Sequence, residues 1–170
     1  MKYFFGFSII FMISLAVSCD KIKSYSDVPH IDFLSYQLLA TTDPDLGNPQ
    51  KTLVINFKFV DGDGDLFDPD APDSTNINKS KLFLTIYQKL NGVFIQVPDS
   101  FFLTPLSARL PYDPVEDRTG QDKTQKGTIQ YRYSFVYPMP FDTIQVKFYI
   151  TDMAEHHSDT IQIPNEIALK

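Results

Sequence analysis

An acidic segment in the middle of the chain is the clearest candidate for binding chemistry. Residues 61–73 read Asp-Gly-Asp-Gly-Asp-Leu-Phe-Asp-Pro-Asp-Ala-Pro-Asp, and no basic side chain follows before Lys79. Six like charges this close repel one another unless the loop extends into water or a cation gathers the carboxylates. Calcium prefers roughly six to eight oxygen ligands, and alternating glycines let a tight loop aim successive carboxylates at one ion. The segment predicts a calcium-binding loop, with a solvated acidic loop or a purely structural Asp turn as the alternatives.

The spacing of the aspartates departs from that of an EF-hand. Aspartate occupies the first, third and fifth positions, but Leu66 stands where glycine is required and Pro72 stands where a bidentate glutamate belongs. We therefore expect a calcium loop grafted between strands, with a structural role for the ion. The expected ligands are Asp63, Asp65 and Asp68, then Asp61, with Asp152 reaching in from the end of another strand.

Residues that support catalysis are sparse elsewhere. His30 lies near the start of the domain, and the adjacent His156 and His157 are predicted to occupy a solvated turn. The chain has no Gly-x-Ser-x-Gly elbow and no phosphate-binding glycine loop. We expect no catalytic residues and no enzymatic activity.

The N-terminus has the pattern of an export signal that ends at the single cysteine. A short positive start precedes mostly apolar residues 3–17, too few to span a bilayer. The sequence Leu-Ala-Val-Ser-Cys at 15–19 resembles a bacterial lipobox, which predicts a signal peptide at 1–18 and a lipidated Cys19. Several acyl chains would anchor the protein stably in a membrane. The alternative is an ordinary secretory peptide with Cys19 as an incidental thiol.

The rest of the chain is predicted to be one all-β domain. Residues 19–29 would be the lipidated cysteine and a polar tether, and residues 30–170 the domain. Apolar and polar residues alternate with period two, and no window keeps a helical period. Asn91-Gly92 between two such runs predicts a hairpin. The expected fold is an antiparallel two-sheet sandwich, Ig-like or fibronectin type III-like, and a closed barrel is the alternative. About seven strands are expected, near residues 31–39, 53–59, 82–87, 93–97, 129–137, 144–150 and 160–163.

Two further features bear on partners. Residues 101–103, Phe-Phe-Leu, lie between Pro98 and Pro105, and we expect an edge strand packed on the core in preference to an exposed binding patch. The formal net charge of −6 and the sequence pI of about 4.9 give no basic surface for nucleic acid.

Two stretches resemble small, uncharacterised lipoproteins of the Bacteroidota. Residues 54–68 combine a strand with an Asp-Gly-Asp-Gly-Asp-Leu loop, and residues 146–163 resemble the closing strands of bacterial Ig-like domains. The resemblance implies a β-sandwich on an exported lipoprotein at the outer membrane or cell surface, with no known reaction.

Three functions follow from these patterns. The first is a calcium-stabilised binding or scaffold domain held at the surface, with protein or glycan partners. The alternatives are a glycan-directed hydrolase that uses carboxylates of residues 61–73, and a structural lipoprotein without a ligand. Aromatic side chains on an outer sheet face, such as Phe83, Tyr87 and Tyr149, would favour recognition. Convergence of the acidic loop with a histidine would favour the hydrolase.

Overall fold

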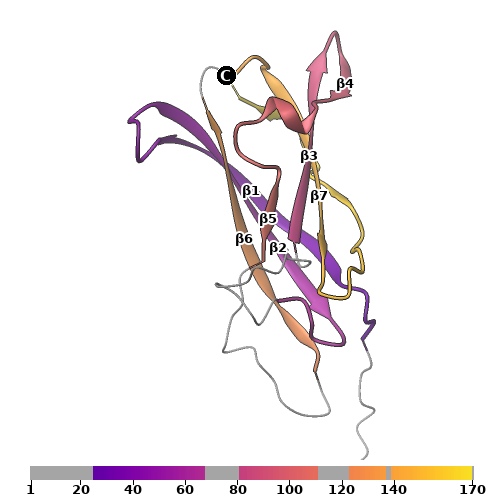
Figure 1. Ribbon diagram of the computed structural model, residues 1–170. Coiled ribbons are helices and arrows are strands. Elements are labelled where there is room, and N and C mark those ends of the chain that lie inside the picture. Colours follow the sequence, from indigo (N-terminus) through magenta and orange to yellow (C-terminus); the bar gives the residue numbers. More distant parts are fainter. Residues whose placement is uncertain (1–24, 68–80, 111–122, 137–138, 170) are drawn as a thin grey trace, which may run out of the picture.

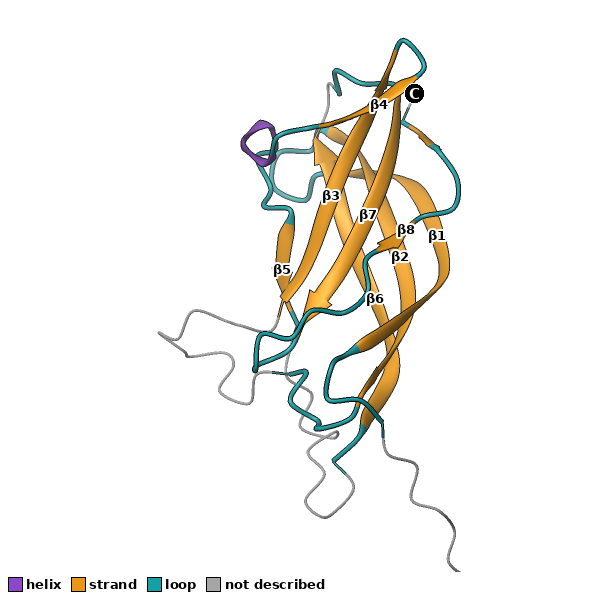
Figure 2. Ribbon diagram, turned by 90° about the vertical axis from the view of Figure 1, so that its right-hand side faces the viewer, coloured by secondary structure: helices purple, strands orange, loops and turns teal. Residues whose placement is uncertain are grey.

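The computed structural model describes residues 25–67, 81–110, 123–136 and 139–169 (Figure 1). In this part of the chain two antiparallel sheets pack face to face, which confirms the predicted all-β sandwich (Figure 2). The described residues contain no α-helix, and none of their segments forms a helix long and apolar enough to cross a membrane. Cys19 and Asp68 lie outside the described residues, as does the predicted signal peptide.

The first sheet has three long strands in the order β1-β2-β6. These are β1 (His30–Thr42), β2 (Pro49–Asp61) and β6 (Gln125–Val136). The alternation predicted for residues 53–59 is present in β2, where the side chains of Leu53, Ile55 and Phe57 face the core. On the other face of β2, Asn56 is partly exposed and Lys58 is exposed, whereas Val54 is buried.

The second sheet has the order β4-β3-β7-β8. Its strands are β3 (Lys81–Leu90), β4 (Val93–Gln96), β7 (Thr143–Thr151) and β8 (Ile161–Gln162). Short strands β5 (Ser107–Arg109) and β9 (Ile167–Ala168) pair with β3 and β7. They raise the described strands to nine from the seven expected. The pairing of β1, β2 and β6 in one sheet and of β3, β7 and β8 in the other follows the A-B-E and C-F-G grouping of Ig-like domains.

The predicted hairpin at Asn91-Gly92 is also confirmed. It joins β3 to β4, and both residues have positive φ, 51° and 82°. Two consecutive positive φ angles are what a type I′ turn requires, and Asn-Gly adopts them at low cost.

The core lies between the sheets and is rich in aromatic and β-branched side chains. Phe57 of β2 and Phe148 of β7 meet across it with ring centroids 5.2 Å apart. Each residue is fully buried, so this contact ties the two sheets together at their centres. Burial of this kind stabilises the fold by about 25 cal/mol per Å² of apolar surface.

The expected edge strand at residues 101–103 is wrong. The structure has a 3-10 turn at Asp99–Phe101, followed by an extended segment, and the side chains of Phe101 and Leu103 are 53% and 89% exposed. Proline explains the difference, because Pro98 and Pro105 cannot donate to a strand ladder and interrupt pairing on both sides of the segment. Only Phe102 turns inward against the core.

Candidate metal centre

The acidic loop lies at one end of the sandwich, where strands of both sheets end. Asp61 is the last residue of β2, and Asp152 directly follows the last residue of β7. Both carboxylates are fully buried. Because β2 and β7 belong to opposite sheets, the packing of the sheets brings these two side chains together. We call this end of the molecule, which carries Asp61, Asp63, Asp65 and Asp152, the acidic pole.

Two glycines let the loop pass close to neighbouring backbone. The N–H of Gly62 donates a hydrogen bond to the carbonyl oxygen of Ser26 at 2.9 Å, and a Cβ on Gly62 would overlap that carbonyl. Gly64 has a φ of +74°, and a Cβ there would overlap the carbonyl oxygen of Lys123. Glycine is required at both positions for steric reasons. The loop is therefore held between the start of the domain and the segment that leads into β6.

Backbone donors position one oxygen of the Asp61 carboxylate and one of the Asp65 carboxylate. Asp61 Oδ2 accepts a hydrogen bond from the N–H of Asp65 at 3.0 Å. Asp65 Oδ2 accepts one from the N–H of Ala154 at 3.0 Å, and the N–H of Met153 donates to the Asp65 carbonyl at 3.1 Å. These bonds join the acidic loop to the turn that follows β7.

The other carboxylate oxygens of the loop converge without such donors. Oδ1 of Asp61, of Asp63 and of Asp65 is buried and has no hydrogen-bond partner among the described residues. The three side chains each offer one oxygen, and these oxygens lie within 4.8 Å of one another. Buried polar atoms are almost always paired in proteins, and a bound cation would satisfy all three of these oxygens at once.

Electrostatic repulsion in the cluster raises the affinity of its carboxylates for protons. Burial, then the charges of Asp63, Asp65 and Asp152, raises the pKa of Asp61 to about 7. Burial, then the charges of Asp152 and Asp63, raises the pKa of Asp65 to about 6. A divalent cation would replace these protons and offset the repulsion.

Asp152 has a histidine partner that was not expected from the sequence. The N–H of His156 donates to Asp152 Oδ1 at 2.7 Å, and His156 Nδ1 lies 2.9 Å from Asp152 Oδ2. This contact raises the pKa of His156 above its ordinary value. Both histidines make contacts that the expected solvated turn did not include, because His156 pairs with Asp152 and the exposed His157 forms a β-bridge with Thr151. The spacing of Asp152 and His156, four residues apart across a turn, is the signal that could have revealed the pair.

The donor set suits a hard cation. Asp61, Asp63 and Asp65 supply oxygen atoms only, which calcium and magnesium prefer, and Asp152 lies close enough to act on Asp61 and Asp65 through its charge. The structure thus brings together three of the five predicted ligands. Asp152 lies nearby with both carboxylate oxygens bonded to His156, and Asp68 lies outside the described residues. Comparisons of the chain with protein-family models, curated proteins and solved structures find no match.

The predicted aromatic side chains lie on the outer face of the second sheet, but their ring faces are largely covered. Phe83 and Tyr149 stack at 4.9 Å, and Tyr149 stacks on His157 at 5.3 Å. Lys147 Nζ lies 5.0 Å from the ring centre of Tyr87. Since stacked rings present their edges to solvent, this face offers little flat surface for a sugar ring.

Proposed function

We propose that the protein is an exported lipoprotein, anchored in the outer membrane through a lipid on Cys19, whose β-sandwich is a calcium-stabilised binding or scaffold domain. The observation that carries the proposal is the convergence of three buried, unpaired carboxylate oxygens at the acidic pole. Calcium would link the end of β2 to the turn after β7 and so stiffen this pole. The partner would be a protein or a glycan at the cell surface.

Calcium is favoured over magnesium because of the ligand set. Magnesium usually keeps several of its waters and binds through one or two carboxylates. Here three carboxylates offer oxygens within 4.8 Å of one another, and Asp61 is fully buried. A larger ion that gives up most of its waters fits this arrangement better.

Thermal unfolding of the detergent-solubilised full chain tests the ion site. We expect a higher melting temperature in millimolar calcium than in chelator, because an ion that binds only the folded state stabilises it by about 2.7 kcal/mol at a hundredfold excess over its dissociation constant. Magnesium should produce a smaller rise. Identical melting curves, with no heat in a calcium titration, would refute the site and favour a structural lipoprotein without a ligand.

Cell fractionation tests the anchor. The sequence places Cys19 directly after the predicted signal peptide, and residue 25 lies next to the acidic loop at the start of the described domain. Replacement Cys19→Ser should abolish incorporation of radiolabelled palmitate and move the protein out of the outer-membrane fraction. Unchanged labelling would show that the cysteine is not lipidated.

A glycan-directed hydrolase is the second candidate, and the Asp152–His156 pair is the observation in its favour. The burial of Asp61 weighs against it, because a polysaccharide could not reach that carboxylate. A glycosidase also separates its two carboxyl groups by about 5 Å or more to hold the sugar between them. Hydrolysis of nitrophenyl glycosides by the full chain, and its loss in Asp63→Asn, would establish this function instead.

A further inference from the structure

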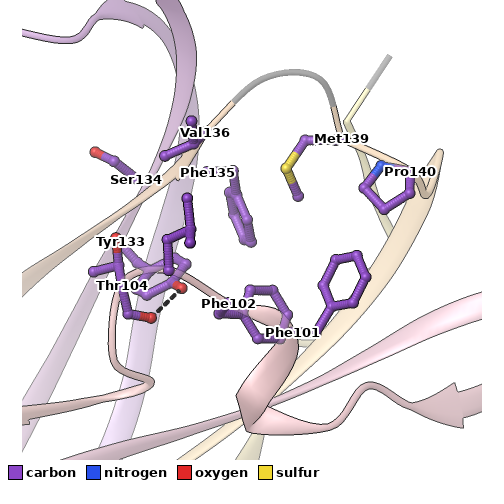
Figure 3. Close-up of a pocket in the computed structure, with 10 residues that line it drawn as sticks. Phe101, Phe102, Thr104, Tyr133, Ser134, Phe135, Val136, Met139 and Pro140 are labelled. Atoms are coloured by element: carbon purple, nitrogen blue, oxygen red, sulfur yellow. Dashed lines mark hydrogen bonds between the residues drawn. The ribbon is translucent and has the colours of Figure 1, made fainter. Parts of the chain in front are cut away.

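A pocket of about 370 Å³ lies at the end of the sandwich opposite the acidic pole (Figure 3). Its walls come from the segment after the 3-10 turn, from the end of β6 and from residues 139–140. Among the described residues that line it, none carries a charge, and most are aromatic or aliphatic. They include Phe101, Phe102, Leu103, Tyr133, Phe135 and Met139.

The pocket walls are held by contacts on both sheets. Phe102 packs edge-on against Tyr133 of β6 at 6.3 Å and against Phe141, just before β7, at 6.1 Å. The hydroxyl of Tyr133 donates a hydrogen bond to the carbonyl oxygen of Thr104 at 2.9 Å. These contacts position the 101–104 segment, so the pocket is a built feature of the fold.

The surface around the pocket is unusually apolar. Phe101, Leu103 and Val136 lie on its rim and are 53%, 89% and 37% exposed. The strand register places two hairpin tips at the same end, and they carry four more exposed apolar side chains. Seven of the eleven large hydrophobic side chains exposed in the described residues lie at this end of the sandwich, three on the pocket rim and four on the two hairpins: Leu46, Leu90, Val93, Ile95, Phe101, Leu103 and Val136. We call this end the apolar pole. Exposed apolar side chains around a pocket are typical of interaction sites.

The charges at the apolar pole are predominantly negative. Lys89 pairs with Glu166 at 2.7 Å, and among the described residues the register and the loops also place Lys51 and four aspartates there. These aspartates are Asp43, Asp45, Asp99 and Asp142. Asp99 also acts on the pocket wall. Burial raises the pKa of Tyr133, and the nearby Tyr131 and then the charge of Asp99 raise it further. A second copy of this pole, or an anionic membrane, would be repelled.

The apolar pole also faces away from the start of the domain. Ser26 contacts Gly62 at the acidic pole, so the tether predicted for residues 19–29 leads to that end (Figure 1). A lipid on Cys19 would place the acidic pole toward the membrane and the apolar pole outward.

We propose that the apolar pole docks a protein partner that inserts an apolar side chain into the pocket and surrounds it with Lys or Arg. The inference rests on the proposed binding role of the domain and specifies the chemistry of its partner. It does not depend on the calcium site. The pocket provides the anchor site, the exposed apolar rim provides the area, and the aspartates select a basic partner.

Fluorescence anisotropy with three labelled peptides tests the proposal on the detergent-solubilised full chain. The peptides are Arg-Lys-Phe-Leu-Lys-Arg, its acidic counterpart Asp-Glu-Phe-Leu-Glu-Asp, and Arg-Lys-Ser-Ser-Lys-Arg, which lacks the apolar pair. Only the first should bind well. Leu103→Ser should weaken it by about tenfold, the size expected for a central interface contact. Val28→Ser removes another exposed apolar side chain, near the tether, and should leave binding unchanged.

Each other outcome would overturn the proposal. Equal binding of the acidic peptide would show that charge does not select the partner. Equal binding of the serine peptide would show that the pocket does not bind an apolar side chain. Equal losses in Leu103→Ser and Val28→Ser would place the peptide elsewhere. Leu103-dependent dimerisation in light scattering, or Leu103-dependent binding to anionic vesicles, would assign the pole to a second copy or to a membrane. All titrations are run in chelator, so a failed calcium site leaves this result interpretable.

Discussion

At the scale of single residues, the stability of the domain depends on a few buried carboxylates, because burial makes their ionised form unfavourable. Asp61 is fully buried and surrounded by three other acids, and the one hydrogen bond that its side chain accepts, from the Asp65 N–H, does not offset this environment. The same arrangement that costs stability without a cation provides high affinity with one. The replacement of one carboxylate separates these two effects.

We expect Asp61→Asn to melt above the wild type in chelator and to lose most of the stabilisation by calcium. The neutral amide removes repulsion from the cluster and removes one anionic ligand at the same time. Calorimetry with and without calcium measures both effects. Asp45→Asn makes the same change in charge at an exposed hairpin tip and should alter neither melting temperature. A full calcium response in Asp61→Asn would contradict the ligand assignment.

At the scale of elements, loops rather than strands carry the features that bear on function. The acidic loop follows β2, the turn with His156 follows β7, and the 101–104 segment follows the 3-10 turn. The strands hold these loops in place through the inter-sheet core, in which Phe57 and Phe148 are central. Much of this was predictable, because period-two alternation identified the six strands of four or more residues, and the alternation at residues 160–163 also marked the two-residue β8. Strands β5 and β9, of three and two residues, were missed.

Replacement of glycine tests how tightly the acidic loop is packed. Gly64 and Gly47 both have positive φ, +74° and +70°, so alanine at either position costs about 1–2 kcal/mol in backbone strain. Only at Gly64 would the new Cβ also overlap a neighbouring backbone atom, the carbonyl oxygen of Lys123. Gly64→Ala should therefore lower the free energy of unfolding in urea clearly more than Gly47→Ala. Equal losses would mean that the loop is not held against Lys123.

At the scale of the whole molecule, the sandwich has two chemically different ends. The acidic pole gathers carboxylates next to the start of the domain, and the apolar pole gathers exposed hydrophobic side chains around a pocket. This polarity suits a domain that is held at one end and binds at the other. The raised carboxylate pKa values of Asp61 and Asp65 lie at the acidic pole, so this end makes the stability of the metal-free protein depend on pH in the acidic range.

We expect the metal-free protein to lose stability as the pH rises from about 4 to 7. Asp61 and Asp65 have raised pKa values of about 7 and 6, compared with 3.8 in an unfolded chain, so in this window the folded state binds more protons and stability must fall. His156 adds in the same direction, because a histidine with a raised pKa contributes stability that is lost as the pH rises through that value. Calcium should flatten the dependence. Melting temperatures across this range, with and without calcium, provide the measurement, and a rise in metal-free stability over the window would contradict the buried cluster.

The sequence by itself determined the features that depend on near neighbours. Alternation defined the main strands, Asn91-Gly92 defined a hairpin, and aspartates alternating with glycine marked the acidic loop, because pleat, turn angles and local charge are set within a few residues. Asp152 was expected at the loop, but only the tertiary structure paired it with His156, and only the tertiary structure closed a pocket between Phe102 and Tyr133. The pocket joins chain segments that are far apart in sequence, and it depends on how two sheets pack, which no local pattern encodes.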